Sequence, residues 1–366
     1  MGILGTYPPT VCGLATFSAA LADGLSANDA AVSVVRVSDG SFTRDARVVG
    51  ELENGRPASV AASSELLNHN DIAIIQHEYG IYGGADGDEV VEILGGLRVP
   101  SIVVAHTVLK NPTPHQRSVL EAVAALADQV VVMSEAANDR LCLGYDVDGE
   151  KISTIPHGAT LPYGVPAGPA GRPTLLTWGL LGPGKGIERV IDAMVSLRDL
   201  PCQYLIAGQT HPKVLAADGE AYRAARVEQA RSRGVADSVR FDDTYRTVSS
   251  LNVLAQSAAA VVLPYDSTDQ VTSGVLVDAI ASGRPVVATA FPHAVELLAS
   301  GAGIVVDHDD PDALASALRR VVTDPHLAAA MAAEARRLAP TMAWSVVAGE
   351  YLRLAQRLIA ERSALV

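Results

Sequence analysis

Three residues with the chemistry of a phosphate site, Thr272, Ser273 and Gly274, precede a helix expected to begin at Val275. The start of a helix leaves N–H groups unpaired and carries partial positive charge, so a phosphate placed there is stabilised. Thr272 or Ser273 can cap the helix, and Gly274 has no side chain to keep a ligand from the backbone. Asp278 follows one turn later on the same face, where its carboxylate could accept hydrogen bonds from a ribose diol. This spacing suits a nucleoside diphosphate, although an ordinary strand–helix–strand unit with Asp278 as a solvated acid explains it equally well.

A second segment with the form of a phosphate cradle runs from Gly179 to Gly186, before a helix expected over residues 187–197. Glycines, among them Gly184, surround Lys185, whose ammonium group can stabilise a leaving diphosphate. The segment is not a nucleoside-triphosphate P-loop, because Gly186 stands where that motif requires Ser or Thr. The sequence therefore holds two segments of phosphate-binding type in its second half.

Short apolar runs that alternate with helical patterns position these segments and indicate parallel α/β structure. Residues 163–173, rich in Pro and Gly, form the clearest linker and divide the chain into two such halves. We therefore expect two Rossmann-like domains that face a cleft, residues 1–162 and 174–343, with a final helix from Trp344. Residues 38–64 are polar and are expected to be irregular, and Glu296 is expected to begin a loop. The strands are expected at 1–5, 31–37, 71–75, 101–105, 129–133, 152–155, 174–178, 203–207, 239–241, 259–263, 285–288 and 303–306.

Loops at the carboxyl ends of the first-half strands are the expected ligand-facing segments there. The first, residues 6–13, ends in Gly13, which would let the backbone approach a phosphate or would serve only the geometry of the loop. The second, residues 76–84, contains His77 and Glu78 but lacks the second His of a zinc-protease helix, since Ile81 stands there. It is either a rim loop that contacts an acceptor or a structural turn. The acceptor-contact candidates are Thr10, His77, Glu78, Tyr79 and Tyr82.

Composition narrows the classes of function. The formal net charge of -13 gives no general attraction for nucleic acid or anionic membrane. Three cysteines without metal-type spacing, and no signal peptide or long apolar run, favour a cytoplasmic protein without a transmembrane segment. We expect no metal site. The oligomeric state is left open, with a homodimer compatible with the sequence.

The segment Val277–Ala288 resembles the donor site of family 4 retaining glycosyltransferases of the two-domain B type. Asp278 stands where that family has the second of two Glu residues, and the first falls on Gln270, beside Asp269. Lys185 and Gly186 match the family's Gly-Arg-x-x-x-x-Lys-Gly segment, whereas Leu180 stands in place of Arg. The match covers most of the chain and is closest over residues 174–290.

The resemblance implies that a sugar nucleotide and a carbohydrate acceptor are the substrates and that no cofactor or essential divalent metal is required. It places His106, directly after a strand, near the transferred sugar, and makes His106, Lys185 and Gln270 the expected catalytic residues. It also assigns the last helix to the first domain. The expected donor-binding residues are Gly13, Gly184, Lys185, Gly186, Phe241, Tyr245, Asp269, Gln270, Thr272, Ser273, Gly274, Val275 and Asp278, of which Phe241 and Tyr245 would contact the base.

The loops TYPPTVCGLATF and QHEYGIYGG look most like those of actinobacterial GDP-mannose-dependent α-mannosyltransferases, which makes GDP-mannose the first expected donor. A glucosyltransferase that uses UDP-glucose or ADP-glucose is the next interpretation. A sugar-nucleotide epimerase or hydrolase, or a non-catalytic nucleotide-binding protein on the same fold, is also open. A dinucleotide oxidoreductase is disfavoured, because no Gly-x-Gly-x-x-Gly follows the first strand.

Overall fold

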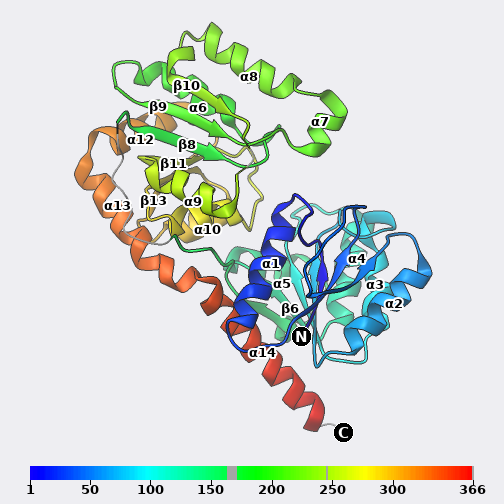
Figure 1. The fold of residues 1–366 in the computed structure, drawn as a ribbon. Coiled ribbons are helices and arrows are strands. Elements are labelled where there is room, and N and C mark those ends of the chain that lie inside the picture. Colours follow the sequence, from blue (N-terminus) through cyan, green and yellow to red (C-terminus); the bar gives the residue numbers. More distant parts are fainter. Residues whose placement is uncertain (163–170, 245, 365–366) are drawn as a thin grey trace. The chain divides into compact units, whose positions relative to one another are not determined.

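The chain forms two compact units, each with one parallel sheet between helices (Figure 1). The computed structural model describes residues 1–162, 171–244 and 246–364. One unit consists of Met1–Gly158 with Met342–Val366, and the other of Ala159–Thr341. The expected linker falls largely on residues 163–170, which lie outside the described residues. The predicted fold class, two Rossmann-like domains with the final helix in the first, is confirmed.

The first unit contains a seven-stranded parallel sheet in the order β3-β2-β1-β4-β5-β6-β7. Its central strands are buried along their whole length, which explains their continuous apolar runs. The strands are β1 (Gly2–Gly5), β2 (Ser33–Val37), β3 (Val48–Leu52), β4 (Ala73–His77), β5 (Ser101–Ala105), β6 (Gln129–Val132) and β7 (Ile152–Thr154).

The first and last helices of this unit pack against one another, so the end of the chain completes a core begun at its start. Phe17, Leu21 and Leu25 of α1 meet Val347 and Tyr351 of α14 in one cluster with the apolar side chains of the sheet. The helices are α1 (Gly13–Ser26), α2 (Pro57–Asn68), α3 (Glu89–Gly95), α4 (Pro114–Leu126), α5 (Glu135–Gly144) and α14 (Trp344–Ala364).

The region expected to be irregular contains regular structure. Strand β3 lies within residues 38–64, and helix α2 begins within them and ends at Asn68. Helix α3, further along the chain, was not predicted either. Strand β3 is the edge of the sheet and mostly only partly buried, so its residues, including Gly50 and Glu51, lack the apolar run of a central strand.

The second unit contains a six-stranded parallel sheet in the order β10-β9-β8-β11-β12-β13. Its strands are β8 (Thr174–Trp178), β9 (Gln203–Ala207), β10 (Val239–Asp242), β11 (Ala260–Leu263), β12 (Val286–Thr289) and β13 (Gly303–Val306). Its helices are α6 (Ile187–Ala193), α7 (Pro212–Asp218), α8 (Ala221–Ser232), α9 (Val248–Ser257), α10 (Gly274–Ala281), α11 (Pro292–Leu298), α12 (Pro311–Thr323) and α13 (Pro325–Leu338). Glu296 lies inside α11, so the loop expected there was wrong.

Each sheet reverses its strand order once, and such a reversal opens a crevice at the carboxyl ends of the two strands beside it. In the first unit the reversal lies between β1 and β4, and in the second between β8 and β11. The loops that follow β8 and β11 are the two segments with phosphate-binding chemistry. The topology thus brings both to one crevice of the second unit.

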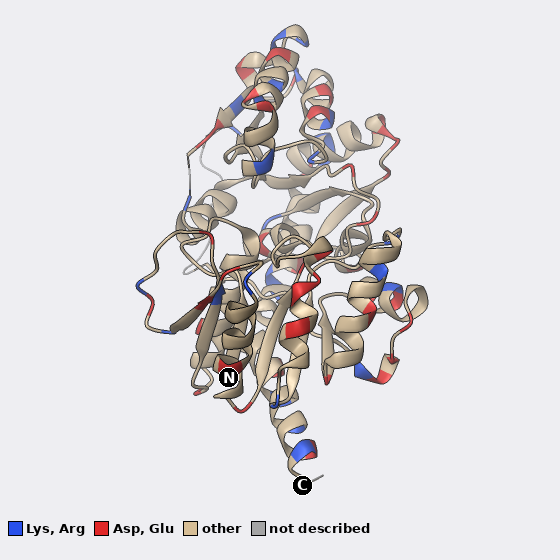
Figure 2. Ribbon diagram, turned by 90° about the vertical axis from the view of Figure 1, so that its right-hand side faces the viewer, with Lys and Arg blue, Asp and Glu red and all other residues tan. Residues whose placement is uncertain are grey.

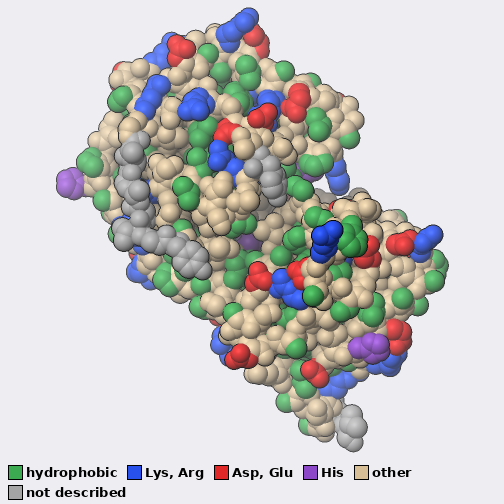
Figure 3. Space-filling view, viewed as in Figure 1, with side chains coloured by type: hydrophobic (Ala, Val, Ile, Leu, Met, Phe, Trp, Pro, Cys, Tyr) green, Lys and Arg blue, Asp and Glu red, His purple; other side chains and the backbone are tan. Residues whose placement is uncertain are grey.

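Along the ribbon in Figure 2, basic and acidic residues are interspersed rather than segregated by sign. On the face drawn in Figure 3, acidic and basic groups stand among hydrophobic ones. Within the described parts of the chain, no group of three or more His, Cys, Asp or Glu side chains could hold a metal ion. The same residues include no helix long and apolar enough to span a bilayer.

Candidate functional site: a nucleotide-type crevice in the second unit

Two loops at the carboxyl edge of the second sheet are locked together by their backbones. The N–H of Asp266, in the loop after β11, donates to the carbonyl oxygen of Gly184, in the loop after β8, at 3.0 Å. Gly186 has a φ of +62°, and a Cβ added there would lie 1.7 Å from the carbonyl oxygen of Pro264. Because only glycine tolerates this approach, Gly186 sets the distance between the two loops.

Lys185 lies between these glycines with its ammonium group over an aromatic ring. Its Nζ stands 4.6 Å from the centroid of the Tyr265 ring, and burial lowers the pKa of Lys185. Among the described residues no carboxylate forms an ion pair with Lys185. Its charge is therefore not compensated by the protein and is available to an anion.

Helix α10 begins beside these loops with its first N–H groups unbonded. The Ser273 hydroxyl caps the helix by accepting from Leu276 N–H at 3.2 Å, as predicted, and Ser273 N–H donates to His293 Nδ1 at 2.9 Å. Ser273 is buried, and its N–H and one acceptor position of its hydroxyl are used within the protein, so its contact with the donor stays a prediction. Gly274 and Val275 have no carbonyl one turn back within the helix, so their N–H groups remain for a ligand.

Two further side chains at this helix start lack partners within the described structure. The Thr272 hydroxyl is buried and makes no hydrogen bond there. Asp278 follows one turn after Gly274, and its carboxyl group also has no partner. Neighbouring atoms crowd this group, and burial raises the pKa of Asp278 to about 7, although the residue as a whole is only partly covered from solvent. Both groups can bind a hydroxyl-bearing ligand.

Two positions that depart from the family pattern are now placed. Gln270 is partly buried, and its amide Nε2 donates to the carbonyl oxygen of Thr272 at 3.0 Å, which leaves its amide oxygen as the group for a sugar. Asp269 is partly buried in the same loop, which follows β11. Leu180, half-buried, supplies no charge in the loop after β8. Arg189 is tied to Asp266 at 2.7 Å and does not replace the missing Arg.

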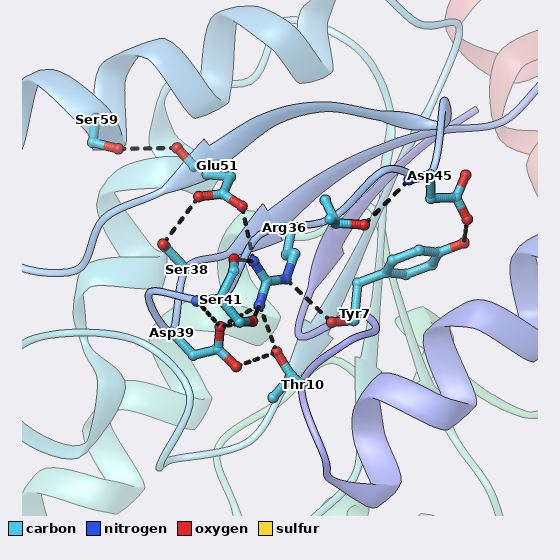
Figure 4. Close-up of polar contacts among 10 residues, drawn as sticks. Tyr7, Thr10, Arg36, Ser38, Asp39, Ser41, Asp45, Glu51 and Ser59 are labelled. Atoms are coloured by element: carbon cyan, nitrogen blue, oxygen red, sulfur yellow. Dashed lines mark hydrogen bonds and ion pairs between the residues drawn. The ribbon is translucent and has the colours of Figure 1, made fainter. Parts of the chain in front are cut away.

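In the first unit, the loop after β1 is held by a buried arginine (Figure 4). Arg36 of β2 is wholly buried and donates to Tyr7 O at 3.2 Å, to Thr10 Oγ1 at 2.9 Å and to Glu51 Oε1 at 2.8 Å. It also bonds Asp39, which accepts from the Thr10 hydroxyl at 2.7 Å. Thr10 therefore serves the protein's own network, which accounts for it without an acceptor contact.

Gly13 is the first residue of α1, not the end of a loop. Cys12 caps this helix, with its Sγ accepting from Ala15 N–H at 3.3 Å. A Cβ added to Gly13 would meet no atom within 4 Å, so the space beside this helix start is open. Gly13 lies in the first unit, whereas every other predicted donor residue lies in the second.

His106 follows β5 directly and is held as a neutral imidazole. Its Nε2 lies 2.6 Å from Gln76 Oε1, an oxygen that can only accept, so Nε2 carries the proton. Phe17 packs edge-on against the ring, with centroids 4.7 Å apart. Burial, with smaller contributions from His157 and His77, lowers the pKa of His106 to about 3. His106 therefore offers no positive charge at neutral pH.

The structure places two predicted acceptor residues, His77 and Tyr82, inside the fold, and their contact with an acceptor stays a prediction. His77 is the last residue of β4 with its side chain 1% exposed, so it lies in the sheet rather than in a rim loop. Tyr82 is 5% exposed, and its hydroxyl donates to Gln76 O at 2.6 Å, which makes it a brace of the turn. Glu78, whose carboxylate accepts from Gly80 N–H, and Tyr79 are only partly buried and stay candidates.

The base-contact candidates are not supported by the described contacts. Phe241 lies in β10 at the edge of the sheet and packs partly buried against the hydrophobic core. Two strands separate β10 from β11, so Phe241 lies on the order of 10 Å or more from the α10 crevice. Tyr245 lies outside the described residues.

Sequence reasoning missed four residues that shape these loops: Arg36, Gln76, Tyr265 and His293. Tyr265 lies two residues after the apolar strand β11, a position that signals burial, although polar residues follow it. Arg36 gave no signal, because an arginine in an alternating strand is normally solvated.

Two family models match successive parts of the chain. One, described as Glycosyltransferase Family 4, matches residues 11–161, and the other, described as Glycosyl transferases group 1, matches residues 172–324. Each match falls almost entirely on one of the two structural units. Together they leave only the two ends of the chain and a short segment between the units unmatched.

Curated relatives carry related names. The chain is 28% identical over 316 residues to a D-inositol 3-phosphate glycosyltransferase of Salinispora arenicola, covering 78% of this chain and 68% of the relative. It is 28% identical over 277 residues to a protein of the same name from Corynebacterium kroppenstedtii, covering 68% of this chain and 60% of the relative. The alignments thus span about two thirds of the relatives' length.

Solved structures share the fold. A sucrose-phosphate synthase of Thermosynechococcus elongatus superposes with a TM-score of 0.80 at 19% identity, covering 98% of this chain and 99% of that one. The Anabaena protein HepE in complex with UDP and glucose superposes with a TM-score of 0.78 at 17% identity, covering 97% and 99%. These likenesses show the B-type fold, and the two family matches, which together span residues 11–161 and 172–324, show that the chain belongs to the group 1 and family 4 glycosyltransferases.

Proposed function

We propose that the chain transfers a hexose from a sugar nucleotide to a hydroxyl group of a carbohydrate or polyol acceptor, with retention of the α configuration. The observation that supports this best is the chemistry gathered at the reversal point of the second sheet. The uncompensated ammonium of Lys185, the unbonded N–H groups at the start of α10 and the unpartnered carboxyl of Asp278 complement a diphosphate and a ribose in turn.

The residues of this site would act chiefly by position and charge. Lys185 and the start of α10 would stabilise the negative charge that develops on the diphosphate as the glycosidic bond breaks. The leaving phosphate oxygen would take the acceptor proton on the same face of the sugar, so no protein nucleophile is needed. His106 is held neutral and would contribute no positive charge to this scheme.

The donor is proposed from resemblance and from named relatives. GDP-mannose remains the first candidate, on the strength of the first-half loops. The complex of HepE with UDP and glucose supports a UDP-hexose as the alternative. The name of the curated relatives adds an inositol phosphate to the acceptors that should be tried.

The test is acceptor-dependent release of nucleotide. The purified chain is incubated with GDP-mannose, UDP-glucose or ADP-glucose, each with and without mannosides, glucosides and inositol 3-phosphate. We expect one donor to release its nucleotide only when an acceptor is present, and we expect the product to be the α anomer by NMR.

Other outcomes point to the other interpretations. Equal release without acceptor would indicate a hydrolase. Donor binding, measured by thermal stabilisation, without release under any condition would indicate a non-catalytic nucleotide-binding protein, an outcome that the residues at Leu180 and Gln270 make worth measuring.

A further inference from the structure

We infer that Tyr265 is a positioning residue that holds the Lys185 ammonium at the diphosphate site without neutralising it. This inference rests on the proposed function, because it concerns the same site. It assigns a role to a buried tyrosine that lies at the carboxyl end of β11 and that no motif singles out.

The first step of the argument is the contact itself. The Lys185 Nζ stands 4.6 Å from the ring centroid of Tyr265, within the range at which an aromatic face attracts a cation. A carboxylate could also orient the lysine, but its charge would offset that of the ammonium. No carboxylate does so here among the described residues, and the ring orients the ammonium while leaving the full charge for a ligand.

The second step is the rigidity of the ring. Tyr265 is 2% exposed and stacks on Phe291, with ring centroids 5.3 Å apart and an angle of 27° between the planes. Its carbonyl oxygen accepts from the Thr289 hydroxyl at 2.7 Å, which fixes the backbone to β12. The ring is therefore a fixed platform on which the flexible lysine side chain rests.

The third step is the location of the platform between the two phosphate-binding segments. On one side its neighbours Pro264 and Asp266 contact Gly186 and Gly184, so the loop that carries Lys185 is fixed to the strand that carries Tyr265. On the other side the same loop leads to Ser273, the cap of α10, whose N–H donates to His293 Nδ1 at 2.9 Å. The lysine charge and the start of α10 are thus both tied to the loop that follows β11.

The experiment compares nucleoside diphosphates with their parent nucleosides. Affinities of GDP, UDP and ADP, and of guanosine, uridine and adenosine, are measured by calorimetry for wild type, Tyr265→Phe and Tyr265→Leu. We expect Tyr265→Leu to weaken the preferred diphosphate about five- to tenfold, with the nucleoside unchanged and Tyr265→Phe close to wild type.

Two further variants separate positioning from general damage. Tyr204→Leu removes a fully buried tyrosine ring from the same sheet that contacts Thr177 rather than Lys185, so it should leave diphosphate affinity unchanged. In a double-mutant cycle, Tyr265→Leu should cost little once Lys185→Met is present, because both changes remove the same interaction.

Three outcomes would overturn the inference: wild-type affinity in Tyr265→Leu, equal losses for diphosphate and nucleoside, or additive losses in the cycle. If Tyr265→Leu does not fold, an NMR measurement on the wild-type protein tests the inference instead. Its sequence has four lysines, and only Lys185 should show Cε protons shifted upfield by a ring in an NMR spectrum with labelled lysine. Failure of the wild type to bind any nucleoside diphosphate would instead count against the proposed function.

Discussion

The guanidinium of Arg36 donates to the hydroxyl of Thr10 at 2.9 Å and so fastens the first loop of the chain to the second strand of its sheet. The same buried group reaches Asp39 and Glu51, whose side chains are 37% and 38% exposed. The cation is fully desolvated while its partners keep some water. The stability of the network therefore depends more on the buried arginine than on either acid.

We expect Arg36→Met to lower the free energy of unfolding of the first unit by roughly 2–4 kcal/mol, because it removes a wholly buried guanidinium that bonds Tyr7 O, Thr10 and two acids. Urea unfolding measures this change. The control is Arg47→Met, since Arg47 pairs with Asp23 and Asp45 but is 29% exposed, and its loss should cost about 1 kcal/mol or less. Equal costs for the two variants would mean that the buried network does not stabilise the loop.

Lys185→Ala should lower kcat by a factor of about 100 to 1,000, because the diphosphate would leave without a compensating cation. Lys213→Ala removes an exposed positive charge from the same unit and should leave kcat within about twofold of wild type. Steady-state rates with saturating donor provide the comparison. Near-normal transfer by Lys185→Ala would remove the lysine from the mechanism.

Affinity for the sugar nucleotide should rise with pH through about 7, because the Asp278 carboxyl must ionise before it can accept two hydrogen bonds from a ribose. With its pKa at about 7, we expect about a tenfold gain in affinity between pH 6 and pH 8. A sugar nucleotide is the right probe, since its diphosphate does not titrate in this range. Asp278→Asn should bind more weakly and with no such dependence.

The same raised pKa has a consequence for the unliganded protein. The folded state holds the proton more tightly than the unfolded chain, whose Asp has a pKa near 3.8. The contribution of the neutral carboxyl is therefore complete below about pH 4 and is lost as the pH rises through about 7. Thermal unfolding of wild type and Asp278→Asn across this window should show the difference, and parallel curves would contradict the raised pKa.

Two helical glycines should respond oppositely to the same substitution. A Cβ at Gly24 of α1 would lie 2.6 Å from the carbonyl oxygen of Trp344 and 2.8 Å from the Cβ of Ala348, so Gly24→Ala should push α14 away. Gly349 of α14 meets nothing closer than 3.7 Å, so Gly349→Ala should stabilise by about 0.5–1 kcal/mol through helix propensity alone. Melting temperatures should fall for the first variant and rise for the second.

The sequence predicted the sheets well because their central strands are buried on both faces. Runs such as Ser101–Ala105 and Thr174–Trp178 were placed at the residues where the structure has them. Strand β3 was not predicted, because an edge strand needs no apolar run. Helix α11 was not predicted either, although Pro292 at its first position is a signal of a helix start.

Local features of the candidate site that rest on backbone chemistry were predicted, and features that rest on packing were missed. The cap at Ser273 and the glycine turn around Lys185 follow from local rules. The burial of His77 in β4 and the ring beneath Lys185 depend on which strands become neighbours, and one sequence does not contain that information. Tyr82 is an example of this limit. The sequence places it in a polar turn, but in the structure its hydroxyl donates to Gln76 O and stabilises that turn.

The packing of α1 against α14 determines the order in which the two units can fold during synthesis. The second unit is one continuous segment, Ala159–Thr341, and can fold as soon as it leaves the ribosome. The first unit begins to emerge earlier, yet it must wait for Trp344–Ala364 to cover the apolar side of Phe17, Leu21 and Leu25. During this interval the nascent chain exposes an incomplete core, so a translation pause before Trp344 would lengthen its exposure to aggregation and chaperones.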